Sequence, residues 1–176
     1  MKIQLTPNGE YNILAMDLGQ STGVAWNTDD RKHAEHWQLK VNNTEPVGMQ
    51  TVRLRNNLEL CVEENNIHII AYELVRRHMG TDAAHVYGRL QGVLFEVSMT
   101  HHIPLLPLEV KQIKKFATGN GNASKEMMEE AAYRLGWTPN PMVKRDKKAL
   151  SDVADAVCML AYAHANVKNL TNLELE

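Results

Sequence analysis

The chain has 176 residues, which suits one domain with a single hydrophobic core that folds without disulfides or a structural metal. Its formal net charge of -2 excludes a uniformly basic nucleic-acid-binding domain. No apolar run approaches the roughly 18 residues of a bilayer-spanning helix, so we expect no transmembrane helix.

The N-terminal part of the chain has the pattern of three short strands. Residues 13–16 are an apolar run, residues 17–23 form a glycine-bearing turn, and residues 24–26 resume the apolar pattern. After a turn over residues 27–32, alternating apolar and polar residues predict a third strand over residues 36–41. Together these segments predict an antiparallel meander.

The rest of the chain alternates between helical and extended patterns. A meander followed by two more strands, with helices between them, predicts an α/β fold: a five-stranded mixed sheet with two parallel strands and helices on its faces. That is the ribonuclease-H-like architecture. The expected elements are a helix over residues 46–66, a strand over 67–74, a helix over 82–101, a strand over 103–108, and helices over 123–135 and 149–165.

We expect one domain over residues 1–176, with its core over about residues 12–165 and peripheral segments at 1–11 and 167–176. The beginning of the chain lacks the basic, apolar and small-residue sections of a secretory signal, which favours a cytoplasmic protein. Cys61 and Cys158 have no CxxC spacing and lie among apolar residues, so we expect buried thiols in a reducing compartment.

Two acidic residues end apolar strands. Asp17 closes the first strand, where an alternative role is an Asx turn that caps the hairpin. Glu73 ends the fourth, where a buried and unpaired carboxylate would be costly. Its alternative is a strand-end charge that reaches solvent or pairs with Arg76 or Arg77.

Two more acids lie three residues apart in the last helix. Asp152 and Asp155 stand among small and apolar residues, and their Cβ atoms are expected to lie about 5 to 6 Å apart on one helix face. A helix-capping role, with Ser151 or Asp152 at the N-cap, explains Asp152 but leaves Asp155 unexplained.

The four acids taken together predict a metal site. Two carboxylates about 4 Å apart repel by roughly 4 kcal/mol at an effective dielectric constant near 20, so a cluster of four calls for cations. Oxygen ligands suit Mg2+ or Mn2+, and two such ions can promote hydrolysis of a phosphodiester.

The segments that carry these acids resemble, in order and spacing, the RuvC family of Holliday-junction resolvases, which are crossover junction endodeoxyribonucleases. The resemblance covers about residues 12–165. The matching segments are Asp17-Leu18-Gly19 with Ser21-Thr22-Gly23, the strand ending in Glu73, Val110-Lys111-Gln112 leading to Gly119-Asn120-Gly121-Asn122-Ala123-Ser124-Lys125, and Ser151-Asp152-Val153-Ala154-Asp155-Ala156.

This resemblance implies that Asp17, Glu73, Asp152 and Asp155 are both the catalytic and the metal-binding residues, with Mg2+ or Mn2+, two per active site, as the cofactor. It also implies branched DNA as the substrate and a homodimer whose two identical sites nick symmetric strands of a four-way junction. Gly88 and Gly92, one turn apart, would allow a partner helix to approach closely; the alternative is close packing of that helix onto the sheet.

A basic block supports DNA binding. Residues 111–148 hold nine Lys or Arg against four Asp or Glu, although a run of charges is also typical of a solvated face. The loop over residues 119–124 precedes a helix and offers backbone N–H groups to phosphate, or it is an ordinary helix entry capped by Ser124. The expected DNA-binding residues are Lys111, Lys114, Lys115, Asn120, Ser124, Lys125, Arg76 and Arg77, of which the resemblance implies Lys111 and Lys125.

The chain departs from the family pattern at two places. Bacterial members commonly carry an aromatic residue three positions after the strand-end glutamate, and this chain has Arg76 there. The connection over residues 137–148 is long, basic and contains prolines, which predicts an added DNA-backbone contact. Both features favour a divergent, phage-like resolvase with activity on a broader range of branched DNA.

Three alternatives from other classes remain. The run from Asp17 to Gly23 also resembles the first phosphate loop of actin-like and sugar-kinase phosphotransferases, which need a second lobe that this chain is too short to hold. A non-catalytic junction-binding protein would not need all four acids. A ribonuclease H or exonuclease shares the architecture, but the lysine-flanked loop and the Asp152 and Asp155 pair favour a resolvase.

Overall fold

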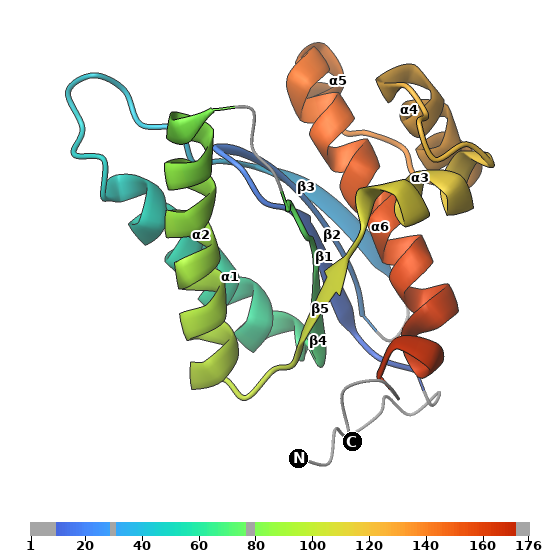
Figure 1. Cartoon of the computed structure of the whole chain (residues 1–176), viewed down its shortest axis with the longest axis horizontal. Helices are drawn as coiled ribbons and strands as arrows, with labels where there is room; N and C mark the ends of the chain where they lie inside the picture. Colours follow the sequence, from blue (N-terminus) through green and yellow to red (C-terminus); the bar gives the residue numbers. More distant parts are fainter. Residues whose placement is uncertain (1–9, 29–30, 77–79, 172–176) are drawn as a thin grey trace.

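The computed structural model describes residues 10–28, 31–76 and 80–171 (Figure 1). Among these residues no helix combines the length and the apolar character that a bilayer-spanning segment requires. The elements in chain order are β1 (Ile13–Asp17), β2 (Ser21–Asn27), β3 (Lys32–Gln38), α1 (Met49–Asn65), β4 (Ile69–Glu73), α2 (Thr81–Thr100), β5 (Leu105–Leu108), α3 (Val110–Thr118), α4 (Lys125–Arg134), α5 (Pro141–Arg145) and α6 (Lys147–Thr171).

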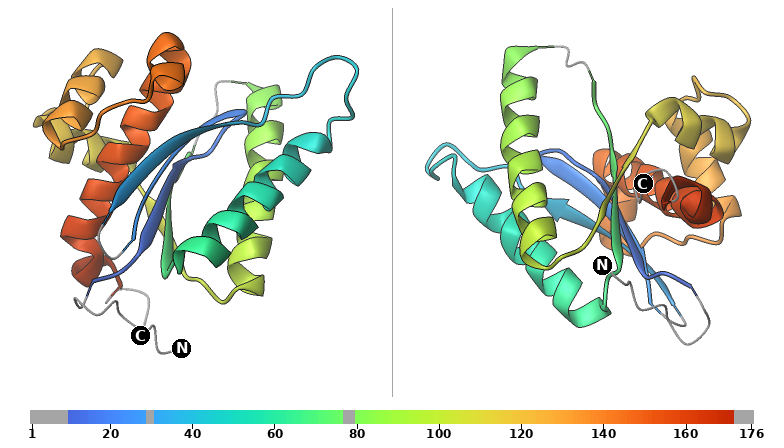
Figure 2. Two further views of the ribbon diagram at one scale, coloured as in Figure 1. Left: turned by 180° about the vertical axis from the view of Figure 1, so that it is seen from behind. Right: turned by 60° about the horizontal axis from the view of Figure 1, so that its bottom comes forward.

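One sheet of five strands, in the order β3-β2-β1-β4-β5, organises the chain. Strands β1, β2 and β3 pair antiparallel, whereas β4 runs parallel to β1 and β5 runs parallel to β4. This confirms the predicted meander with two added parallel strands. Helices α1 and α2 cover one face of the sheet, and α3, α4 and α6 lie on the other (Figures 1 and 2).

Alternation along the central strands divides the core between the two faces. Leu14 and Met16 of β1 pack in the cluster on the α1 and α2 side, whereas Ile13 and Ala15 pack in the cluster that includes residues of α6. Since side chains alternate with a period of two, the next residue on the α6 side is Asp17. The strand pattern therefore directs this carboxylate toward the last helix.

Several predicted boundaries were wrong. Strand β3 occupies Lys32–Gln38 rather than residues 36–41, because its ladder with β2 starts at the pair Asn27 and Lys32, directly after the turn. Beyond β3, the N–H groups of Leu39 and Lys40 donate to the carbonyl oxygen of Gln20, outside the β2–β3 register. Helix α6 is longer than the predicted residues 149–165, and α3 and α5 were not predicted at all.

Strand β2 and helix α6 touch at a glycine. A Cβ atom built on Gly23 would lie 1.9 Å from the backbone oxygen of Asp152 and 2.6 Å from the backbone nitrogen of Val153. No side chain fits in that space, and the obstacle is backbone, which cannot rotate away. Gly23 therefore allows the N-terminal turns of α6 to lie directly against the sheet.

We predict that Gly23→Ala destabilises the fold strongly, because the added methyl group pushes α6 away from β2. The free energy of unfolding should fall by about 3 kcal/mol or more. Gly48→Ala is the control, since a Cβ there meets nothing within 4 Å, and it should change that free energy by less than about 1 kcal/mol. Urea denaturation of both variants measures the difference, and equal losses would contradict this account of the β2–α6 contact.

Candidate active site

Asp17 and Glu73 end adjacent parallel strands at the same edge of the sheet. The register of β1 with β4 runs from Ile13 opposite Ile69 to Met16 opposite Tyr72, so the next residues in line are the two acids. The hydroxyl group of Tyr87 donates a hydrogen bond to the backbone oxygen of Glu73 at 2.8 Å and ties the end of β4 to α2. Both carboxylates are half-buried.

The described residues form neither an Asx turn at Asp17 nor an ion pair between Glu73 and Arg76. The turn after β1 is closed by Thr22, whose hydroxyl donates to the backbone oxygen of Gly19 at 2.6 Å and accepts from its N–H at 3.2 Å. The neighbouring Arg76 forms its ion pair with Glu109 at 2.8 Å, not with Glu73. Arg77 lies outside the described residues.

Helix α6 supplies the other two acids. It begins at Lys147, and Asp146 caps it by accepting the N–H groups of Lys148 at 2.9 Å and Ala149 at 3.1 Å. The prediction that Ser151 or Asp152 could serve as the N-cap was therefore wrong. Asp152 instead lies one turn inside the helix and is buried, and Asp155 is half-buried.

The four acids form one electrostatic cluster. Burial, followed by the charges of Glu73, Asp155 and Asp152, raises the pKa of Asp17 well above its ordinary value. Burial also raises the pKa of Glu73. Burial, opposed by Lys114 and reinforced by Glu73 and Asp152, raises the pKa of Asp155 to about 6. Burial is the largest cause of each shift in pKa, and for Asp17 and Asp155 the charges of neighbouring acids add to it.

Three residues that were not predicted to belong to the site lie beside Asp152. Two of them bond its carboxylate, and the third bonds Ser21. The hydroxyl of Ser21 donates to Asp152 Oδ2 at 2.5 Å, and the Lys148 ammonium donates to Oδ2 at 2.9 Å and to Oδ1 at 3.2 Å. His36 Nε2 lies 2.8 Å from the Ser21 hydroxyl oxygen. Lys148, one turn before Asp152 on the same helix, had a sequence signal, the i, i+4 spacing of opposite charges. Ser21 lies in one of the segments that resemble the RuvC family.

The donor chemistry fits a hard divalent cation, although the side chains are not arranged as a ligand set. Within the described ranges, no three His, Cys, Asp or Glu side chains converge closely enough to hold a metal ion as they stand. Four carboxylates with an unneutralised charge are the ligands that Mg2+ and Mn2+ prefer. Coordination by Asp152 would require Lys148 to release it.

The predicted DNA-binding lysines divide into two groups. Lys114 and Lys125 reach the acids, because both charges lower the pKa of Asp155 and Lys114 also lowers that of Glu73. Lys114 Nζ further donates to the backbone oxygen of Ala123 at 3.0 Å. Lys111 and Lys115 are exposed on α3, and Lys111 lies beside the loop, where its backbone oxygen is 3.3 Å from a Cβ built on Gly121.

The loop over residues 119–124 is stabilised by its own side chains. Asn120 Oδ1 accepts the N–H of Asn122 at 2.9 Å, and the Ser124 hydroxyl caps α4 by accepting the N–H of Met127 at 3.3 Å. Ser124 therefore has the capping role that the sequence allowed. Both residues are exposed, so they remain open to solvent while they hold the loop.

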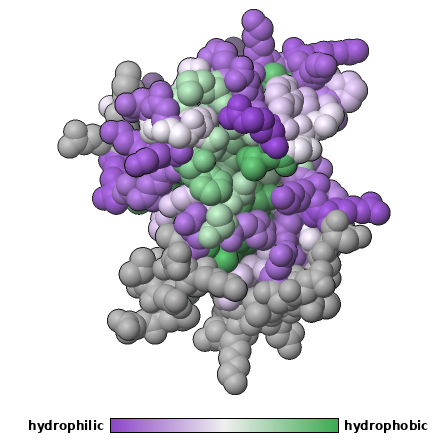
Figure 3. All heavy atoms as spheres, turned by 90° about the vertical axis from the view of Figure 1, so that its right-hand side faces the viewer, coloured by the Kyte–Doolittle hydropathy of each residue, from purple (hydrophilic) through white to green (hydrophobic). Residues whose placement is uncertain are grey.

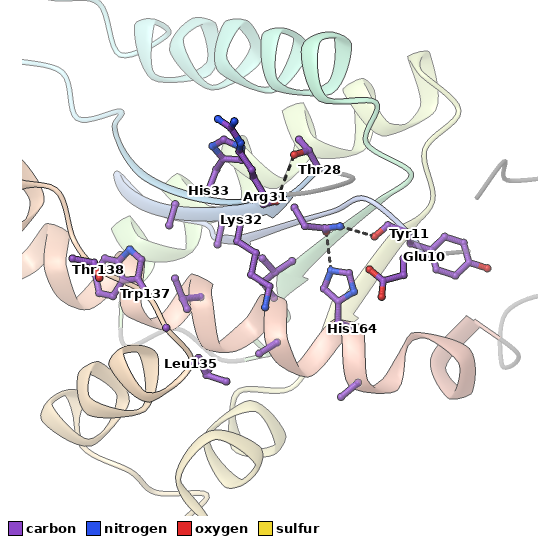
Figure 4. A pocket seen from close by; sticks show the side chains of 18 of the residues that line it. Glu10, Tyr11, Thr28, Arg31, Lys32, His33, Leu135, Trp137, Thr138 and His164 are labelled. Carbon is purple, nitrogen blue, oxygen red and sulfur yellow. Dashed lines mark hydrogen bonds between the residues drawn. The ribbon is translucent and has the colours of Figure 1, made fainter. Parts of the chain in front are cut away.

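A cavity of about 1160 Å³ lies away from the acids (Figure 4). It separates the start of β3, at Lys32, from the later turns of α6 and from Trp137. His164 Nε2 lies 2.7 Å from Asn27 Oδ1 in its lining, and none of the four acids borders it. Seen from the right-hand side of Figure 1, the surface of the molecule has a central apolar strip between hydrophilic side chains (Figure 3). The acid cluster therefore lies outside this cavity.

Comparison with known sequences points to one group of nucleases, although no protein-family model matches the chain. The crossover junction endodeoxyribonuclease RuvC of Magnetococcus marinus is 23% identical over 159 residues, which is 88% of this chain and 83% of that protein. The RuvC of Porphyromonas gingivalis is 35% identical over a shorter stretch of 71 residues. That stretch spans 40% of this chain and 38% of that protein's length.

Solved structures give the same answer for the fold. Thermus thermophilus RuvC in complex with a Holliday junction substrate matches with a TM-score of 0.72 at 18% identity, covering 92% of this chain and 98% of that chain. In sequence and in fold the chain is similar to RuvC nucleases. The yeast mitochondrial Holliday junction resolvase Ydc2 matches with a TM-score of 0.55 at 18% identity, over 97% of this chain and 85% of that chain.

The raised pKa of Asp155 predicts a measurable effect on stability. The folded protein holds this proton more tightly than the unfolded chain, so the free energy of unfolding falls as the pH rises from about 4 through about 6. Asp155→Asn removes the charge. Without metal, at about pH 7.5, it should therefore raise the free energy of unfolding by roughly 1 to 3 kcal/mol, with no difference near pH 4.

Urea denaturation in EDTA across this pH range tests the prediction. Glu63→Gln is the matched control, because Glu63 is exposed on α1 and its substitution should leave the pH dependence as in the wild type. A loss of stability for Asp155→Asn at neutral pH would show that the carboxylate is stabilised, not penalised, by its surroundings.

Proposed function

We propose that the protein is a structure-selective endonuclease that cuts Holliday junctions and other branched DNA by metal-dependent phosphodiester hydrolysis. The observation that carries this proposal is that four acids from β1, β4 and α6 form one electrostatic cluster at the end of a RuvC-like sheet. We expect the activity in the cytoplasm, and we retain the phage-like origin as a prediction.

The four acids share one task in this proposal. Asp17, Glu73, Asp152 and Asp155 would hold Mg2+ or Mn2+, two ions per site, which supply activation of the attacking water and neutralise charge on the leaving oxygen. Because burial already raises the pKa values of Asp17, Glu73 and Asp155, the protein alone leaves the negative charge poorly compensated. The site is therefore set up to gain free energy when cations bind.

The lysines around the acids would hold the DNA backbone. Lys114 and Lys125 interact electrostatically with Asp155, so a phosphate near the acids also lies near these ammonium groups. Lys111 and Lys115 extend the basic surface along α3, and the loop with Asn120 and Ser124 presents the N-terminus of α4. The side chain of Arg76 pairs with Glu109 but is 72% exposed, so in this proposal it exchanges Glu109 for a DNA phosphate.

An exposed apolar stripe on α2 supports a homodimer. Gly88 and Gly92 have open space where a Cβ would lie, so they do not serve close packing onto the sheet. Phe95 and Met99 continue the same stripe and are 42% and 74% exposed. Positions 88, 92, 95 and 99 share one helix face, and small residues at one end of it allow a second α2 to approach. A C2 dimer would place two sites symmetrically on one junction.

The deciding experiment is incubation of the protein with an immobile four-way DNA junction and Mg2+ or Mn2+. We expect paired nicks that are symmetric across the junction. Asp17→Asn and Glu73→Gln should each reduce the nicking rate by at least about a hundredfold, because each removes a buried ligand charge. Glu63→Gln, on the exposed face of α1, should cut like the wild type.

Other outcomes would select other functions. Tight junction binding without cutting in either metal would favour the non-catalytic junction-binding alternative. Cutting of RNA in an RNA–DNA hybrid, with the junction left intact, would favour a ribonuclease H. Either result would overturn the resolvase proposal.

The dimer proposal has its own test. Met99→Asp places a charge in the apolar stripe and should convert the dimer into a monomer in sedimentation equilibrium. Met142→Asp is the matched control, since Met142 on α5 is 80% exposed but lies outside the stripe. A wild-type monomer, or a dimer that survives Met99→Asp, would rule out this interface.

A further inference from the structure

A hydrogen-bonded chain leads from the edge strand β3 to the acid cluster. His36 on β3 lies 2.8 Å from the hydroxyl of Ser21 on β2, which in turn lies 2.5 Å from Asp152 Oδ2 on α6. The three residues are far apart in sequence and meet because Gly23, between Ser21 and Val24, lets α6 lie against β2. The register of β3 with β2 places His36 directly opposite Gly23.

The donor and acceptor in each of these two hydrogen bonds follow from the number of protons available. A serine hydroxyl has one proton, and an ionised carboxylate can only accept. The Ser21 proton therefore goes to Asp152, and the His36 ring nitrogen must donate to the Ser21 oxygen. His36 in this way fixes the orientation of the hydroxyl that holds Asp152.

The hydrogen bond from Ser21 also determines which carboxylate oxygen of Asp152 remains available. Oδ2 accepts from both Ser21 and Lys148, whereas Oδ1 accepts only the longer contact of 3.2 Å from Lys148. Asp152 is 5% exposed, so its side chain has little freedom to turn once Oδ2 is held. When Lys148, whose side chain is 65% exposed, swings away, Ser21 still holds Oδ2 and leaves Oδ1 for the cluster.

We infer that Ser21 and His36 are positioning residues that orient Asp152 for metal binding; this rests on the proposed function of the acid cluster. Ser21 acts on the carboxylate directly and His36 acts through Ser21. Partners of this kind that hydrogen-bond a metal-binding carboxylate typically change metal affinity by about 10- to 100-fold when they are removed. Neither residue touches the substrate in this account.

The test measures Mn2+ affinity by electron paramagnetic resonance of the free ion, in the full-length protein without DNA. Ser21→Ala and His36→Ala should each weaken Mn2+ binding about 10-fold or more. Ser21→Thr keeps the hydroxyl and His36→Gln keeps an N–H donor, so both should restore binding to near the wild-type value. Thermal denaturation of each variant separates this effect from a general loss of structure.

His33→Gln is the matched control, since His33 lies on the same strand but stacks on Trp26, and it should bind Mn2+ like the wild type. If Ser21→Ala and His36→Ala fold and bind Mn2+ as the wild type does, the positioning role is wrong while the proposed function stands. If the wild type itself binds no Mn2+ and leaves junctions uncut, the proposed function fails and the inference fails with it.

Discussion

The contact of Gly23 with the backbone of Asp152 is the constraint on which the site depends. It lets α6 lie so close to β2 that a side chain on the strand can bond a carboxylate on the helix. The same approach brings Asp152 and Asp155 beside the end of β1, where Asp17 pairs with Gly23 across the ladder. A helix held further from β2 would move Asp152 and Asp155 away from Asp17.

The cluster is an electrostatic cost that the fold accepts. Buried carboxylates whose pKa values rise are less stable in the charged form than they would be in water, so they reduce the stability of the metal-free protein at neutral pH. Lys148 offsets part of this cost by pairing with Asp152. Since that ammonium sits on a flexible and exposed side chain, it can leave when a cation of higher charge arrives. The metal-free protein is therefore less stable at neutral pH, and binding of a cation would remove part of this destabilisation.

Strands with a continuous apolar run and helices with regularly spaced apolar residues were predictable from the sequence, and so were the acids in them. The apolar runs that end in Asp17 and Glu73, and the apolar surroundings of Asp155, predicted the cluster, because charged residues are rarely placed there without a partner. The start of β3 was not predictable, since its polar residues pair through the turn register and not through an apolar pattern. His36 was missed for the same reason, because its role depends on that register.

The net charge of the chain conceals how its charges are distributed. Acids gather at the edge of the sheet, and Lys114, Lys125 and Lys148 surround them within electrostatic reach. A polyanion approaching this edge meets the lysines first, because Lys125 and Lys148 are exposed and the acids are partly or fully buried. Positive charge outside and negative charge inside is the order that a metal-dependent nuclease needs, with the backbone phosphates held by ammonium groups and the cations held beneath them. A net charge near zero is therefore compatible with DNA binding when the two signs are layered in this way.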